Sequence, residues 1–176
     1  KGVQVTADVS AHHLGLNEKC LNEFDSAYKF EPPLRSDKDM SALIKGLKDG
    51  TIDCIVSDHS PHRLEDKEAD LLNAQSDSIG LESAFSYSNQ VLSSKGFDIT
   101  DILKLFTINP SSIINLDWEP LKINADIDLV IINPDVKWKF GKKDIFSKSK
   151  NSAFLGQNMK GKVEMVLHKN KFFKIS

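Results

Sequence analysis

The chain has 176 residues, of which 40% are hydrophobic, and its formal net charge at pH 7 is −2. This near-neutral charge gives no electrostatic reason to expect binding to nucleic acid or to an anionic membrane. No apolar run approaches the roughly 18–20 residues of a membrane helix, and two cysteines are too few for a disulfide framework, so we expect a reducing, cytoplasmic setting.

The first part of the chain alternates strand and helix signals. Residues 3–9 alternate apolar and other side chains, which is the period of a β-strand. Ser36, with Asp39 three residues later, predicts a capped helix that ends at Gly50. Residues 52–56 form a short apolar run that predicts a second strand. The chain opens directly on a strand without Met, which indicates a piece of a longer protein.

A long polar connection and three further helices are predicted next. Residues 63–78 are charged and turn-like, and connections of this length are often lids or binding loops. A helix is expected over about 80–94. Thr100 is predicted to cap a second helix, and Asn109-Pro110 to open a third.

The pattern changes near residue 120. Residues 1–118 alternate strand and helix, whereas 119–176 are mostly strand-like. The last segment predicts a hairpin with Lys169-Asn170 as its turn. We therefore expect an α/β unit over 1–118, followed by a mainly β segment over 119–176.

The stretch "CIVSDHSPH", from Cys54 to His62, carries the main candidate site. Asp58 ends an apolar strand, and His62 follows four residues later, beyond a proline. This group of residues is compatible with an ordinary turn, since Asp and Ser-Pro are common turn residues. It is also compatible with chemistry, because a carboxylate at the carboxyl end of a parallel strand can bind a metal and move a proton.

Five segments in order resemble the dihydroorotases of the cyclic amidohydrolase group. They are "VTADVSAHHLGL", "KFEPPLRSDKD", "DGTIDCIVSDHSPH", "SIGLESAF" and "FTINPSSIINL". The later segments "NADIDLVIINPDVKWKF" and "FLGQNMKGKVEMVLHKNKFF" look like the C-terminal β part of that family. The resemblance implies the C-terminal part of a (β/α)₈ TIM-like barrel, containing its last two strands, followed by strands of a small β domain.

The resemblance also implies a function. The family reaction is the reversible cyclisation of N-carbamoyl-L-aspartate to dihydroorotate, a step of pyrimidine biosynthesis that uses zinc. Asp58 matches the aspartate that binds metal and moves the proton, and His62 matches the histidine that contacts the substrate carboxylate. The remaining zinc ligands are expected from a missing N-terminal portion. The implied partners are a small-molecule substrate and a second copy in a homodimer, or aspartate transcarbamoylase.

Two substrate-side positions depart from the family pattern. Glu31 stands where the family has a substrate-binding Asn, and Asp77 stands in a loop that is usually Ala-Pro-Phe-Gly. These acids leave open a non-catalytic dihydroorotase-like partner of aspartate transcarbamoylase. An allantoinase or hydantoinase is a third alternative, although His62 favours dihydroorotase. His12 and His13 are expected to be mainly structural, with a smaller expectation that one lines the site.

Overall fold

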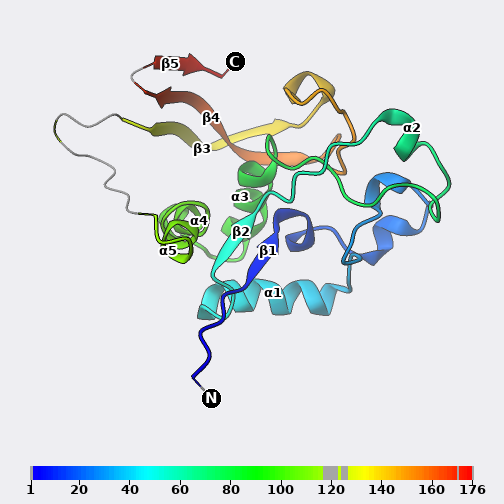
Figure 1. Cartoon of the computed structure of the whole chain (residues 1–176), viewed down its shortest axis with the longest axis horizontal. Coiled ribbons are helices and arrows are strands. Elements are labelled where there is room, and N and C mark those ends of the chain that lie inside the picture. Colours follow the sequence, from blue (N-terminus) through cyan, green and yellow to red (C-terminus); the bar gives the residue numbers. More distant parts are fainter. Residues whose placement is uncertain (1, 117–122, 124–126, 170, 176) are drawn as a thin grey trace.

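The computed structural model describes residues 2–116, 123, 127–169 and 171–175. Its strands form a parallel pair and a separate antiparallel sheet, with a helix between them (Figure 1). The pair consists of β1 (Asp8–Ser10) and β2 (Cys54–Val56), and the antiparallel sheet has the order β3 (Leu129–Lys139), β4 (Asn158–His168) and β5 (Lys171–Lys174).

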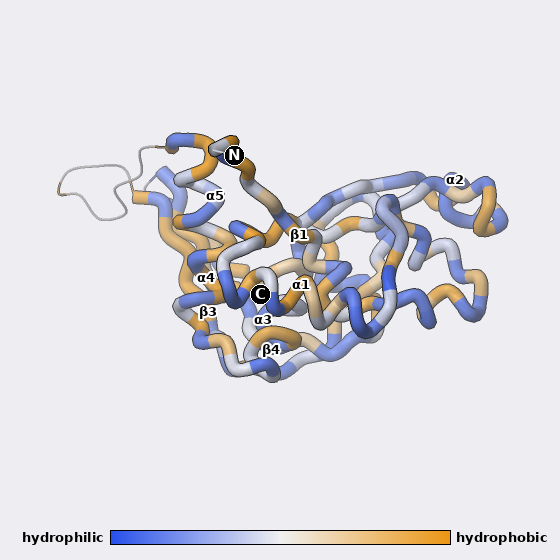
Figure 2. The backbone as a smooth tube through the Cα atoms, turned by 90° about the horizontal axis from the view of Figure 1, so that it is seen from below, coloured by the Kyte–Doolittle hydropathy of each residue, from blue (hydrophilic) through white to orange (hydrophobic). Residues whose placement is uncertain are grey.

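Helices make up much of the rest of the described chain. They are α1 (Asp37–Asp49), α2 (Leu64–Lys67), α3 (Ala84–Ser94), α4 (Ile99–Phe106) and α5 (Ile108–Ile113), with short 3₁₀ helices η1 (Ala11–Leu14), η2 (Glu18–Leu21), η3 (Ser26–Tyr28) and η4 (Lys142–Asp144). The mainly hydrophilic loop that carries α2 lies at the opposite end of the molecule from α4 and α5 (Figure 2). Among the described residues, no helix is long and apolar enough to cross a membrane.

The first strand is shorter than the sequence pattern predicts. Of residues 3–9, only the last two belong to β1, and Val3 and Val5 are about 80% exposed (80% and 79%). The pairing explains the difference, because β1 runs parallel to β2 with Asp8 opposite Cys54 and Ser10 opposite Val56. A strand is stabilised by its neighbour, and β2 contributes only three residues to the ladder.

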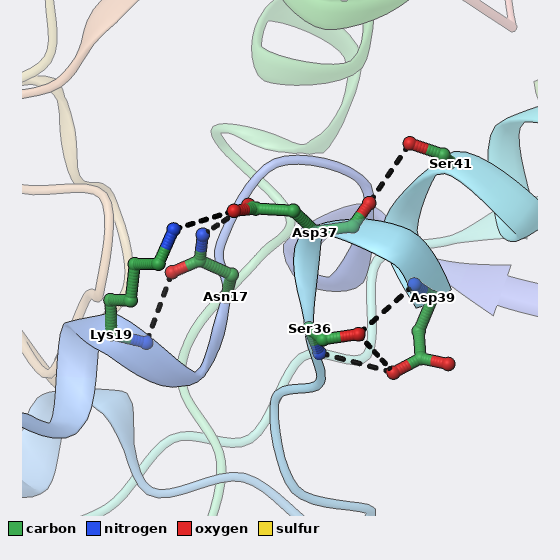
Figure 3. A network of polar contacts seen from close by, with 6 residues as sticks. All are labelled: Asn17, Lys19, Ser36, Asp37, Asp39 and Ser41. Atoms are coloured by element: carbon green, nitrogen blue, oxygen red, sulfur yellow. Dashed lines mark hydrogen bonds and ion pairs between the residues drawn. The ribbon is translucent and has the colours of Figure 1, made fainter.

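The helix α1 has the capping box that the sequence predicts. The Ser36 hydroxyl accepts the Asp39 N–H, and the Asp39 carboxylate accepts the Ser36 N–H (Figure 3). Gly50 ends the helix in the left-handed conformation, with φ 78°. Beside this cap, Asp37 bonds to Lys19 and Asn17, which ties the preceding 3₁₀ segment to the helix start.

Three predicted helix starts differ from the observed ones, by one to four residues. The cap of α4 is Asp98 rather than Thr100, because the Asp98 carboxylate accepts both the N–H and the hydroxyl of Thr100. The helix α5 begins at Ile108, before Asn109-Pro110. Proline is tolerated in the first turn of a helix, where its missing N–H has no intrahelical partner. The helix predicted over 80–94 begins at Ala84, after a turn.

The C-terminal strands form a hairpin, as the sequence predicts. β4 pairs with β5, and Lys169 in their turn has φ 46°, whereas Asn170 lies outside the described residues. Within the segment "NADIDLVIINPDVKWKF", the residues from Leu129 to Lys139 form one strand, β3, which has an irregularity between Asn133 and Lys137. The boundary predicted at 118/119 also lies outside the described residues.

Two clusters of buried side chains form the core. One lies under the parallel pair and includes Val9, Ile55 and Leu92. The other joins early and late parts of the chain, and includes Phe30, Ile79, Tyr87, Phe140, Phe154 and Met159. The helix α3 contributes Leu92 to the first cluster and Tyr87 to the second, so it fixes the antiparallel sheet relative to the parallel pair.

Candidate functional site

The carboxyl ends of β1 and β2 bring the candidate residues to one edge. The two strands are parallel, with Asp8 opposite Cys54 and Ser10 opposite Val56, so their carboxyl ends lie at the same edge of the pair. The chain continues from β1 into η1, which carries His12 and His13, and from β2 into the turn with Asp58. This edge is the one where sites form in parallel β/α folds.

A close backbone contact sets the position of the turn after β2. A Cβ atom at residue 80 would lie 1.9 Å from the carbonyl oxygen of Ser57, so only glycine allows the two segments to approach this closely. His59 adds a second contact, since its Nδ1 accepts the N–H groups of Gly80 and Leu81 at 3.2 and 3.3 Å. Asp58 lies between these contacts with φ 47°.

Asp58 is an exposed carboxylate in an acidic environment. Although the residue is exposed, neighbouring protein atoms displace part of the water around its carboxylate, and this desolvation raises the pKa of Asp58. The nearby charge of Asp77 raises the pKa further, whereas His13 and a hydrogen bond from Ser10 lower it. Both acids favour a bound cation at this edge, because a positive charge would relieve their repulsion.

The described residues fit part of a metal site. Asp58 could supply one oxygen ligand, a type that zinc accepts. Within the described part of the chain, no three His, Cys, Asp or Glu side chains converge on one point. A site with three or four protein ligands would therefore need residues beyond those described.

His62 is half-buried, and one of its ring nitrogens is used by the protein. Its Nε2 donates to the carbonyl of Ser76 at 2.7 Å and lies 3.2 Å from the Ser60 hydroxyl. Because a carbonyl oxygen can only accept, Nε2 carries a proton. The ring Nδ1 makes no hydrogen bond to a described residue and is left for a ligand.

Glu31 is joined to the site through Asp77. The Glu31 side chain is exposed, and its backbone N–H donates to Asp77 Oδ1 at 3.0 Å. Asp77 has φ 72°, and its own N–H donates to Lys29. The structure thus brings Asp77 near Asp58. The hydrogen bond from the Glu31 backbone N–H to the Asp77 carboxylate links Glu31 to these two acids.

His12 and His13 differ in their surroundings. His12 is fully buried and stacked on Phe154, with ring centroids 4.6 Å apart. Burial lowers the pKa of His12 to about 4, so it is neutral at pH 7. Its Nδ1 bonds to Ser10 at 3.0 Å. His13 Nε2 donates to the Pro32 carbonyl at 3.0 Å. The His13 ring is close enough to Asp58 to lower the pKa of that carboxyl group.

Two lysines hold the loop that contains Asp77, which sequence reasoning did not find. The buried Lys67 ammonium donates to the carbonyls of Gln75 and Asp77 at 2.8 and 3.1 Å. Lys29 donates to the carbonyls of Leu72 and Ala74 at 2.9 and 2.6 Å. Lys67 lies in the charged, turn-like stretch 63–78, and no local signal distinguishes it from the other charged residues there.

A cavity of about 720 Å³ opens beside the turn, between residues 25–27, 61–68 and 142–155. His62 and Asn151 line it, together with the basic residues Arg63, Lys67, Lys142, Lys148 and Lys150. Asp58 does not line it, so the cavity reaches the site from the His62 side.

Sequence comparison identifies the family. Residues 2–171 match the model of the amidohydrolase family. The chain belongs to the amidohydrolase family. It is 43% identical to the dihydroorotase of Caldicellulosiruptor saccharolyticus over 98% of this chain and 40% of that protein. It is 40% identical to the dihydroorotase of Elusimicrobium minutum over 93% of this chain and 38% of that protein. This amidohydrolase chain therefore spans about 40% of the length of these curated relatives.

Solved structures confirm the fold class. The L-hydantoinase (dihydropyrimidinase) of Arthrobacter aurescens is similar over 96% of this chain and 39% of that one, with a TM-score of 0.86 and 22% identity. An inactive dihydroorotase-like domain of a CAD-like multifunctional protein of Chaetomium thermophilum is similar over 97% of this chain and 44% of that one, with a TM-score of 0.68 and 20% identity. The chain is thus a C-terminal part of an amidohydrolase barrel with its β segment.

Proposed function

We propose that the complete protein is a dihydroorotase that cyclises N-carbamoyl-L-aspartate reversibly to dihydroorotate in pyrimidine biosynthesis. The observation that carries the proposal is the position of Asp58. It is an exposed carboxylate at the carboxyl end of β2, with His62 four residues later in the same turn. The names of the curated relatives support the choice of substrate.

In this proposal Asp58 is the catalytic carboxylate and a metal ligand. Zinc, when bound, would polarise the cyclic amide carbonyl and lower the pKa of a water molecule. In the hydrolytic direction, an Asp58 oxygen accepts the proton of the attacking water and delivers it to the ring nitrogen that leaves. A positioned carboxylate contributes about 10²–10⁴-fold to such a transfer.

His62 is proposed to bind the substrate carboxylate. Because Nε2 is engaged with Ser76, the nitrogen offered to the substrate is Nδ1. Protonation of that nitrogen would give a charge-assisted hydrogen bond to the carboxylate. The neighbouring cavity is lined by five Lys or Arg side chains and by two acids, Asp25 and Glu68, and this excess of positive charge favours the approach of a dianionic substrate from that side.

Glu31 is proposed to lie on the substrate side and to weaken binding. A carboxylate a few ångströms from a dianion is repulsive by roughly 1–4 kcal/mol under surface-like screening. Glu31 is exposed, so it can turn toward solvent. Its bonded neighbour Asp77 adds a second negative charge near Asp58.

The same two acids favour a second candidate, a non-catalytic dihydroorotase-like partner of aspartate transcarbamoylase. Such a protein would keep the barrel while losing affinity for the dianion. An allantoinase or a hydantoinase is a third candidate, and hydrolysis of allantoin or of a hydantoin by the complete protein would reveal it.

A homodimer and a cytoplasmic setting also belong to the main proposal. The two free thiols, Cys20 and Cys54, fit a reducing compartment.

The test is an assay of dihydroorotate hydrolysis by the complete protein. Asp58→Ala should remove nearly all turnover, His62→Ala should mainly raise KM, and Glu31→Asn should leave KM unchanged or lower it. His168→Ala is the control for His62, since His168 is an exposed histidine at the end of β4, bonded to Asp128. Full activity in Asp58→Ala would contradict the catalytic assignment. A wild type without turnover at any zinc loading would favour the non-catalytic candidate.

A further inference from the structure

A residue far along the chain holds the turn that carries His62. The side chain of Asn151 accepts the His62 N–H at Oδ1, and its Nδ2 donates to the Ser60 carbonyl, both at 3.1 Å. These two backbone groups lie on either side of Pro61, which has no N–H of its own. One amide side chain therefore satisfies the main chain on both sides of the proline.

Asn151 is itself held in place from two directions. The backbone carbonyl oxygen of Asn151 accepts hydrogen bonds from the Ile79 N–H and from the Ser78 hydroxyl, both at 3.0 Å. The Ser149 hydroxyl donates to the His62 carbonyl at 2.6 Å and also contacts the Asn151 amide. The amide is thus presented to the turn by a segment that is anchored to the buried residues 78–79.

We infer that Asn151 is a positioning residue that sets the place of the His62 imidazole. This inference rests on the proposed function. The ring is bonded at Nε2 to Ser76, and the backbone of the same residue is bonded to Asn151. With the main chain and one ring nitrogen both held, a protonated Nδ1 can donate to a substrate carboxylate without reorganisation, and this preorganisation favours binding.

The decisive variants are Asn151→Ala and Asn109→Ala in the complete protein. Asn109 is the matched control, because it is also a half-buried asparagine, and its Nδ2 donates to the Asp53 carbonyl at 2.7 Å. That bond lies just before β2, at the opposite end of the strand from the turn. Both variants lose an amide-to-carbonyl bond, and only Asn151→Ala releases His62.

We expect Asn151→Ala to raise KM for dihydroorotate about tenfold with kcat within about twofold, which corresponds to about 1.4 kcal/mol of binding. Asn109→Ala should lower Tm about as much as Asn151→Ala does, and it should leave KM unchanged. Asn151→Asp keeps an acceptor for the His62 N–H and should raise KM less than Asn151→Ala does. Equal KM values for the two alanine variants would overturn the inference, because the effect would then be one of general stability.

Amide hydrogen exchange separates this inference from the proposed function. The His62 N–H should exchange faster in Asn151→Ala than in wild type, and at the wild-type rate in Asn109→Ala. Unchanged protection of His62 in Asn151→Ala would overturn the positioning role, whether or not the protein is active. A wild type that hydrolyses no dihydroorotate would refute the proposed function, and exchange would still decide whether Asn151 holds the turn.

Discussion

Gly80→Ala tests whether the contact between residue 80 and the turn after β2 positions Asp58. The added Cβ would lie 1.9 Å from the Ser57 carbonyl oxygen and 3.1 Å from Cε1 of His12. Carbon and oxygen atoms that are not bonded to each other rarely approach closer than roughly 3.3 Å. The overlap with Ser57 therefore exceeds 1 Å, and it falls on backbone, which cannot rotate away as a side chain can.

The size of the effect follows from this overlap. Overpacking a buried site costs about 1–3 kcal/mol of folding free energy. A shift of roughly 1 Å in a catalytic group can cost about 10²-fold in rate. Because Ser57 directly precedes Asp58, we expect Gly80→Ala to lower stability by about 2 kcal/mol and turnover by about a hundredfold.

Urea unfolding measures the first effect, and dihydroorotate hydrolysis by the complete protein measures the second. Gly141→Ala is the control, since residue 141 has an ordinary extended φ of −137° and its Cβ would meet only Asp144 Oδ2 at 3.6 Å. If Gly80→Ala had wild-type stability and turnover, the close contact between residue 80 and Ser57 would not be what positions Asp58.

Three further predictions concern stability and metal. Burial lowers the pKa of His12 from 6.5 to about 4, so the contribution of the neutral ring to stability should be full above pH 6.5 and be lost as the pH falls toward 4. The loss should be roughly 3 kcal/mol of unfolding free energy. Urea unfolding at several pH values should show this loss in wild type and not in His12→Gln. Ser36→Ala should cost about 1 kcal/mol in urea unfolding without changing KM, and a larger loss or a raised KM would show that the cap does more than start α1. The 176-residue chain alone should hold far less than one zinc after dialysis, because Asp58 is its one assigned ligand; elemental analysis near one zinc per chain would contradict this.

Local signals were enough for the features that a few consecutive residues control. The capping box of α1 depends on Ser36 and Asp39, which are three residues apart, and the sequence shows both. Asp58 and His62 could be named because an apolar strand ends just before them. The longer strands and helices could be ordered from local sequence patterns, whereas α2 lies in the stretch 63–78 that is predicted as a connection. The resemblance of motifs in sequence order predicted the fold class that the solved structures confirm.

The tertiary structure decided everything that depends on distant partners. β1 is short because its ladder with β2 has three residues, which no pattern within residues 3–9 reveals. Asp77 lies near Asp58 because Lys67 holds carbonyls of the intervening loop, and Asn151 meets His62 across 89 positions of sequence. Local propensity reports backbone preference over a few residues. A hydrogen bond between distant segments forms only once packing has brought them together, so its partners could not be predicted from either segment by itself.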